Sequence, residues 1–152
     1  IESLALTPAL VALIPLVVAD AGIIGSILGA RLSSALHLRE IEAFKWSRLF
    51  LKNIVAIFIL GNASSILTGF LVFAAFTVLK VPVPNLSTML VFSFQVCFTV
   101  TAGMIILTTL IAFESFKRGL DPSNVVIPIM TSLGDVMGVF SLVGIASIQG
   151  FI

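Results

Sequence analysis

The stretch that decides the fold is residues 119–150, GLDPSNVVIPIMTSLGDVMGVFSLVGIASIQG. With Ser123 as its expected N-cap, it predicts an apolar helix over 124–150 that is long enough to cross a hydrocarbon layer about 30 Å thick. The single charged residue inside that helix is Asp135, roughly 18 Å from the expected cap at about 1.5 Å per residue. A carboxylate at this depth costs about 2.5 kcal/mol even on the mildest insertion scale, so it normally faces a partner, water or an ion.

The helical neighbours of Asp135 favour water or an ion over a basic partner. Thr131, Ser132 and Gly138 share its side of the helix, and they are small or carry hydroxyl groups. The alternative is a neutral, protonated carboxyl group that is hydrogen-bonded inside a dry helix bundle.

The amino-acid composition indicates the class of protein to which this chain belongs. Of its 152 residues, 59% are hydrophobic and 10% are charged, whereas soluble domains carry about 25% charged residues, so an integral membrane protein is expected. The net charge of +1, with basic residues at the ends of apolar runs, argues against nucleic-acid binding.

The sequence offers no Ser/His/Asp set and only one histidine, His37, so we expect no enzyme. His37 is expected to be structural.

The apolar residues fall into four runs, which predict an all-α, polytopic membrane helix bundle with four long, partly kinked transmembrane helices. We expect one transmembrane domain over 1–152 and no soluble sensor domain. Pro15 and Gly22 bound a segment of the first run where a kink or local unwinding is expected. The expected spans are about 4–36, 53–79, 86–116 and 124–150.

Small residues recur every four positions in the first run, at Ala21, Gly25, Gly29 and Ser33. This spacing predicts a ridge on which another helix can approach closely. Before the second run, residues 40–52 mix basic and aromatic side chains, which predicts an amphipathic helix at the membrane–water interface.

Basic residues indicate the orientation. Seven of the eight lie in or beside the connections that follow the first and third runs, and the other side has only Lys80. By the positive-inside rule those connections are cytoplasmic, and both chain ends lie outside a plasma or inner membrane. Because an N-terminus that starts outside is unusual, we expect a preceding span to be absent from this sequence.

Five residues of the last run form a recognisable pattern. Asp121-Pro122, Pro128, Asp135 and Gly138 read together as DP-x5-P-x6-D-x2-G. This resembles the final transmembrane helix of the MgtE-type magnesium transporters and of their solute-carrier relatives in animals. The first run also resembles the glycine-rich second helix of that family, from Asp20-Ala21-Gly22 to the small-residue segment after Arg31.

The resemblance implies that the four runs are the last four helices of a five-helix protomer. It implies a homodimer around a central cation pathway, magnesium as the main substrate, and an aspartate of the last helix, here Asp135, at the ion site. The first helix and the soluble magnesium-sensing domains of the family have no counterpart in this sequence. Asp20 stands where the family has an asparagine, and Ile127 stands where it has a polar residue.

The expected function is therefore a magnesium transporter or channel with passive inward flux, with Mn²⁺ and Co²⁺ as further candidate ions. Magnesium prefers six oxygen ligands and keeps much of its water, so few protein ligands are needed. The alternative is an ion-coupled exchanger that uses Asp20 and Asp135. The candidate metal-site residues are Asp135, Asp20, Thr131 and Asn124; Gly22, Gly25, Gly134, Gly138 and Ser132 are expected to line the pore or to pack helices.

Three of these assignments have a structural alternative. Asp20 can equally be a polar contact at the expected kink, and Asn124 can simply help to begin the last helix. Glu114 precedes Lys117 and Arg118 by one helical turn, so a surface ion pair is its expected role.

Overall fold

The computed structural model describes residues 2–150, with the side chains of residue 8 and of residues 11–150. The chain forms four α-helices and, over the described residues, no strand: α1 (Glu2–His37), α2 (Arg48–Val78), α3 (Leu86–Lys117) and α4 (Pro122–Ile148). All four contain segments that are long and apolar enough to cross a membrane. These findings confirm the prediction of an all-α polytopic membrane helix bundle.

The first helix is continuous through both of its prolines, Pro8 and Pro15. The local unwinding predicted between Pro15 and Gly22 is therefore wrong. A membrane helix tolerates a proline when neighbouring helices hold the flanking turns, and here Leu13, Val17 and Ala21 are buried against the rest of the bundle.

The segment before α2 also differs from expectation. Residues 38–47 form turns and loop, so the amphipathic helix predicted over 40–52 is wrong for most of its length. Arg39 and Phe44 have positive φ values of 58° and 61°, which a right-handed helix excludes. The helix starts where the hydroxyl group of Ser47 accepts a hydrogen bond from the backbone N–H of Phe50.

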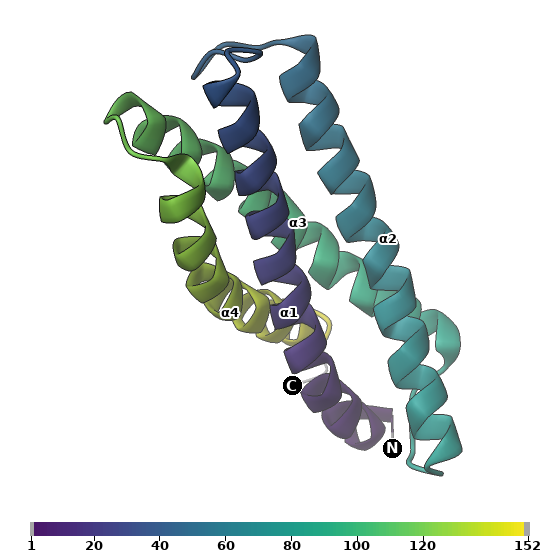
Figure 1. The fold of residues 1–152 in the computed structure, drawn as a ribbon. Helices are drawn as coiled ribbons and strands as arrows, with labels where there is room; N and C mark the ends of the chain where they lie inside the picture. The colour runs from purple at the N-terminus through teal and green to yellow at the C-terminus, as the bar shows by residue number, and fades with distance from the viewer. Residues whose placement is uncertain (1, 151–152) are drawn as a thin grey trace.

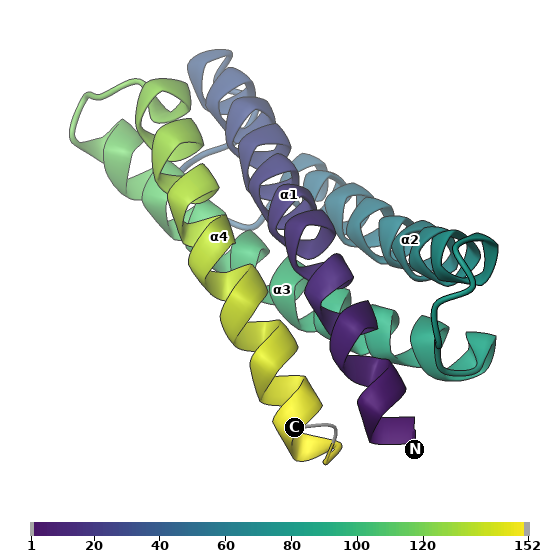
Figure 2. The same ribbon diagram turned by 90° about the horizontal axis from the view of Figure 1, so that it is seen from below.

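The other three helices pack around α1. In Figures 1 and 2, α1 lies between α4 and α2, while α3 crosses behind it. The most extensive contact joins α1 to α4, and α2 and α4 do not touch over the described residues. Apolar side chains of α1 and α3, among them Leu28, Leu32, Val96 and Met104, fill the centre of the bundle.

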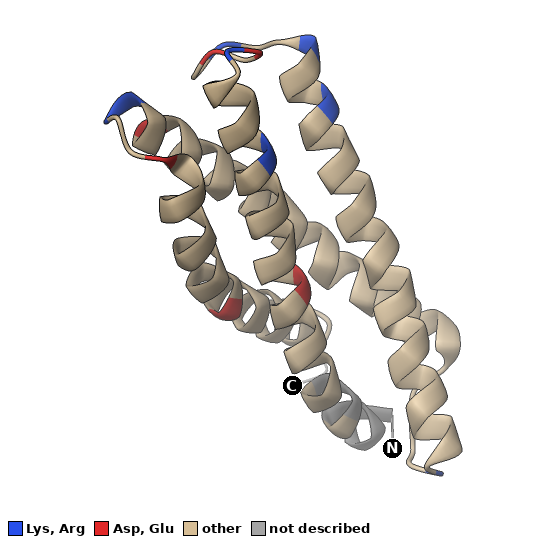
Figure 3. Cartoon of the chain, viewed as in Figure 1, with Lys and Arg blue, Asp and Glu red and all other residues tan. Residues whose placement is uncertain are grey.

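Charged residues gather at one end of this bundle. Figure 3 shows the Lys and Arg positions clustered at the α1–α2 and α3–α4 connections, with a single basic position at the α2–α3 turn at the other end. The two ends of the described chain also lie at that other end (Figure 1). The bundle therefore has one strongly basic end, here called the basic end.

Candidate functional site

The N-cap of the last helix is Asp121, not the expected Ser123. The Asp121 carboxylate accepts hydrogen bonds from the backbone N–H and from the hydroxyl group of Ser123, and Pro122 fills the first turn of α4. Pro122 has no N–H to lose there, whereas Ser123 donates its own N–H and so lies inside the helix. The cap moves two residues toward the N-terminus, which places Asp135 fourteen positions beyond it.

The same carboxylate ties α4 to the end of α1. Ser33 donates its hydroxyl hydrogen to Asp121 over 3.0 Å, and the Nε2 atom of His37 lies 3.4 Å from the same oxygen. The side-chain amide of Asn124 donates to the other oxygen. The hydrogen bonds from Ser123, then those from Ser33 and His37, lower the pKa of Asp121 from 3.8 to about 2. Asn124 is thus engaged in starting the helix, far along α4 from Asp135.

Glycines bring α1 and α4 into close contact below this cap. A methyl group added at Gly134 would lie 2.8 Å from the backbone nitrogen of Gly22, and one at Gly25 would lie 2.8 Å from Cβ of Met130. Gly138 similarly faces the backbone of Val18. The predicted ridge of small residues is therefore a helix-packing face that α4 covers.

Asp135 lies beside this contact, in a shallow groove of about 520 Å³ along the outer face of the α1–α4 pair. Thr131 lines the groove one turn before it, and Gly22 forms part of its floor. Asp135 is exposed in the single chain, and none of the residues lining the groove is basic. The hydroxyl groups of Thr131 and Ser132 both donate to the carbonyl oxygen of Pro128, so they reinforce the turn that follows the proline.

The sequence analysis did not assign Pro15, Ala19 and Ser26 to the site, although they line the α1 side of the same groove. Together with Gly22 they follow a spacing of four, three and four residues, the period of one helix face. This spacing was the feature of the sequence that could have identified the groove. It did not stand out, because the helix is apolar around its whole circumference.

Asp20 lies elsewhere. Its carboxylate accepts hydrogen bonds from Ser64 (3.1 Å) and Thr68 (3.3 Å) of α2, and it is absent from the lining of the groove. The structure thus brings Asp135, Thr131 and Gly22 together and separates them from Asp20 and Asn124. Over the described residues, no three His, Cys, Asp or Glu side chains come together as a metal-binding group.

Glu114 forms the expected surface ion pair, with its carboxylate 2.8 Å from the guanidinium group of Arg118. Glu114 lies at the basic end and is not among the residues that line the groove.

Comparison with known protein families identifies a match over most of the chain. The family profile described as MgtE, divalent cation transporter, matches residues 14–145. Searches of curated proteins and of solved structures gave no match. The matched residues include both sides of the α1–α4 groove.

Proposed function

This chain belongs to the MgtE family of divalent cation transporters, and on that premise we propose that it carries magnesium passively inward along the α1–α4 groove, with a second copy of the chain completing the pathway. The observation that carries the proposal is the exposed carboxylate of Asp135 in a groove without a basic residue. Facing lipid it would cost several kcal/mol, so the groove is the part of the surface that needs water, an ion or a partner.

The depth of Asp135 suits an ion pathway. Fourteen residues beyond the cap, at about 1.5 Å per residue, correspond to roughly 21 Å, about halfway along α4. An ion at this level is far from bulk water on both sides, so a negative charge there offsets part of its loss of hydration. Thr131, one turn closer to the basic end, adds an oxygen that a hydrated ion can meet.

The chemistry of magnesium fits a groove with few ligands. Mg²⁺ dehydrates reluctantly and binds through one or two carboxylates while it keeps several waters. The groove supplies one carboxylate per protomer, and a two-fold axis along it would supply two facing each other. A pair of carboxylates attracts divalent cations as acidic rings do in cation channels. Mn²⁺ and Co²⁺ present the same charge and are expected as competing ions.

The orientation follows from the basic end. By the positive-inside rule this end is cytoplasmic and the C-terminal end of α4 lies outside. With the inside negative, a divalent cation moving inward gains about 4.6 kcal/mol per 100 mV, twice the value for a single charge. Passive influx therefore needs no second ion.

The test is uptake of magnesium into proteoliposomes by Asp135→Asn. We expect the flux to fall by roughly tenfold or more, because losing a unit charge next to a divalent ion removes several kcal/mol of attraction. Glu114→Gln is the matched control, since it makes the same chemical change at the basic end and should transport like the parent. Parental flux in a folded Asp135→Asn protein would refute the proposal.

An ion-coupled exchanger is the second candidate, and the position of Asp20 favours it. The two hydroxyl groups from α2 form, with this carboxylate, a separate polar site in the membrane region where a proton or sodium ion could be held apart from the divalent ion. Coupling predicts that a proton or sodium gradient drives magnesium uptake against its own gradient, and that Asp20→Asn abolishes this. Magnesium uptake that depends on neither gradient would exclude coupling and support the passive pathway.

A further inference from the structure

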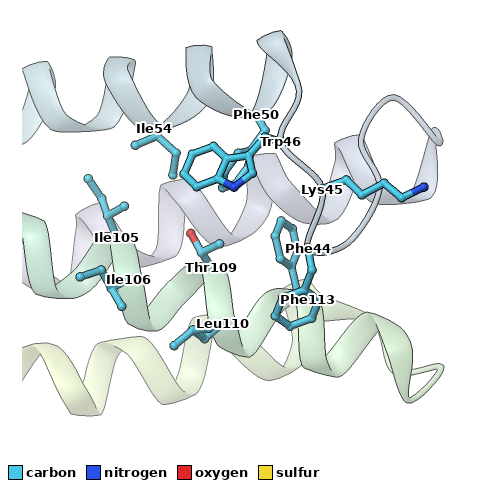
Figure 4. A pocket seen from close by; sticks show the side chains of 10 residues that line it. All are labelled: Phe44, Lys45, Trp46, Phe50, Ile54, Ile105, Ile106, Thr109, Leu110 and Phe113. Atoms are coloured by element: carbon cyan, nitrogen blue, oxygen red, sulfur yellow. The ribbon is translucent and has the colours of Figure 1, made fainter.

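A second cavity, of about 300 Å³, lies away from the groove, between the α1–α2 connection, the start of α2 and the end of α3. Figure 4 shows the indole ring of Trp46 over its centre, with Phe50 and Ile54 on one wall and Ile105, Ile106 and Leu110 on the other. It shares no lining residue with the Asp135 groove. The transport mechanism proposed above makes no use of it.

The mouth of this pocket is on the outer surface of the bundle. Trp46 is 83% exposed, Ile106 60% and Leu110 50%. On a chain whose helices span a membrane, large exposed apolar side chains of this kind contact lipid, and Trp concentrates at the level of the headgroups. An apolar pocket open to this region matches an acyl chain better than a water-soluble ligand.

The rim of the pocket toward the basic end carries charge. Lys45, which lines the pocket, is already paired with Glu42. Lys117 holds its ammonium group 4.3 Å from the ring centroid of Phe44 and forms no ion pair with any described residue. Lys117 thus supplies an uncompensated cation beside Phe44, at the end of the pocket where a headgroup would sit.

A polar atom in the wall also lacks a partner. The hydroxyl oxygen of Thr109 is buried and makes no hydrogen bond within the described residues, and Figure 4 shows it directed toward the side of the pocket that Trp46 covers. A buried hydroxyl without a partner is unfavourable, so a ligand oxygen at this level would be stabilised.

We propose that this pocket binds one phospholipid with an anionic headgroup. Its acyl chain lies between Ile54 and Ile106, the hydroxyl group of Thr109 donates to a glycerol ester carbonyl, and Lys117 holds the phosphate. Basic pockets between membrane helices on the cytoplasmic side bind acidic lipids in this way. The inference is independent of the transport pathway.

The chain carries its own reporter, because Trp46 is its single tryptophan and it has no tyrosine. The chain is placed in phosphatidylcholine bilayers that contain brominated phosphatidylglycerol or, separately, brominated phosphatidylcholine at equal mole fraction. We expect the brominated anionic lipid to quench Trp46 more strongly and to saturate at a low mole fraction. Lys117→Gln should lower the preference roughly fivefold, the effect of one basic side chain near the surface. Lys80→Gln, at the opposite end, should leave it unchanged.

Equal quenching by the two lipids, or a preference that Lys117→Gln leaves intact, would overturn the proposal. Quenching that rises linearly without saturation would show ordinary contact with surrounding lipid, and no quenching would show that protein covers the pocket; both contradict a lipid site. Thr109→Val is a second variant for the same quenching experiment. It removes a hydroxyl that has no protein partner, so the fold should persist while quenching by the anionic lipid weakens.

Discussion

Asp20, Asp121 and Asp135 are three carboxylates on or beside the two helices that pack most closely, and their neighbours give them different roles. Asp121 accepts several hydrogen bonds at a helix start, and Asp20 accepts two from hydroxyl groups of α2. Asp135 lies in a groove with no basic residue. Charge alone therefore does not distinguish them, and it is the surroundings of Asp135 that favour it as the candidate ion site.

Asp121 gives a pH-dependent prediction. Because its pKa falls from 3.8 to about 2 on folding, its contribution to stability is present above about pH 4 and is lost as the pH falls through about 2. Asp121→Asn, which resembles the protonated acid, should lower the unfolding temperature at neutral pH. Circular dichroism of detergent-solubilised protein should show this difference shrinking to nothing near pH 2. A constant difference across the pH range would show that the carboxylate charge is irrelevant.

The α1–α4 pair depends on residues without side chains. Gly22 and Gly134 meet backbone to backbone, and the contact places the turn that bears Asp135 directly beside α1. In lipid, helices gain little from burying apolar side chains against each other, so close approach at small residues supplies much of the packing energy. The position of the candidate ion site therefore follows from this glycine contact.

Gly134→Ala tests that contact. Its added methyl group would stand 2.8 Å from the Gly22 backbone nitrogen, so the helices must separate, at a cost of about 1–3 kcal/mol. Gly144→Ala on the same helix is the matched control, because nothing lies within 4 Å of the added group. We expect a lower unfolding temperature and lower magnesium flux for Gly134→Ala only. Equal unfolding temperatures and equal fluxes for the two variants would show that the Gly22–Gly134 contact does not determine how α1 and α4 pack.

At the scale of the whole molecule, the single chain has an exposed carboxylate on its outer surface, about halfway along α4. A two-fold axis along the α1–α4 groove would cover that surface and place two Asp135 side chains around one pathway. The exposed face of α2, on the other side of α1, has apolar residues without a charged residue at this depth and suits lipid.

Cross-linking tests this arrangement. Ile23 lines the groove, and Ile59 is similarly exposed on α2. In a Cys97→Ala background, Ile23→Cys should form a disulfide-linked dimer in membranes under mild oxidation, and Ile59→Cys should not. Non-reducing gel electrophoresis separates the two forms. Cross-linking through Ile59→Cys alone would show that the dimer interface lies on α2, which contradicts the proposed pathway along the α1–α4 groove.

The sequence by itself determined the number of helices, the basic end and the motif that indicates the family, because these depend on hydropathy, charge and residue spacing. It also located the small-residue ridge of α1. It failed at the loop before α2, where Arg39 and Phe44 adopt positive φ values that composition does not reveal.

Only the tertiary structure decided which side of each helix faces a partner. A helix that is apolar around its whole circumference has no amphipathic period to indicate direction. Asp20 and Asp135 are similar in sequence terms, as lone acids within apolar runs, and packing alone places one against the hydroxyl groups of α2 and the other in the α1–α4 groove. The start of α4 at Asp121 rests on local contacts with Ser123 and on Pro122 in the first turn, and packing adds the contacts from Ser33 and His37 of α1.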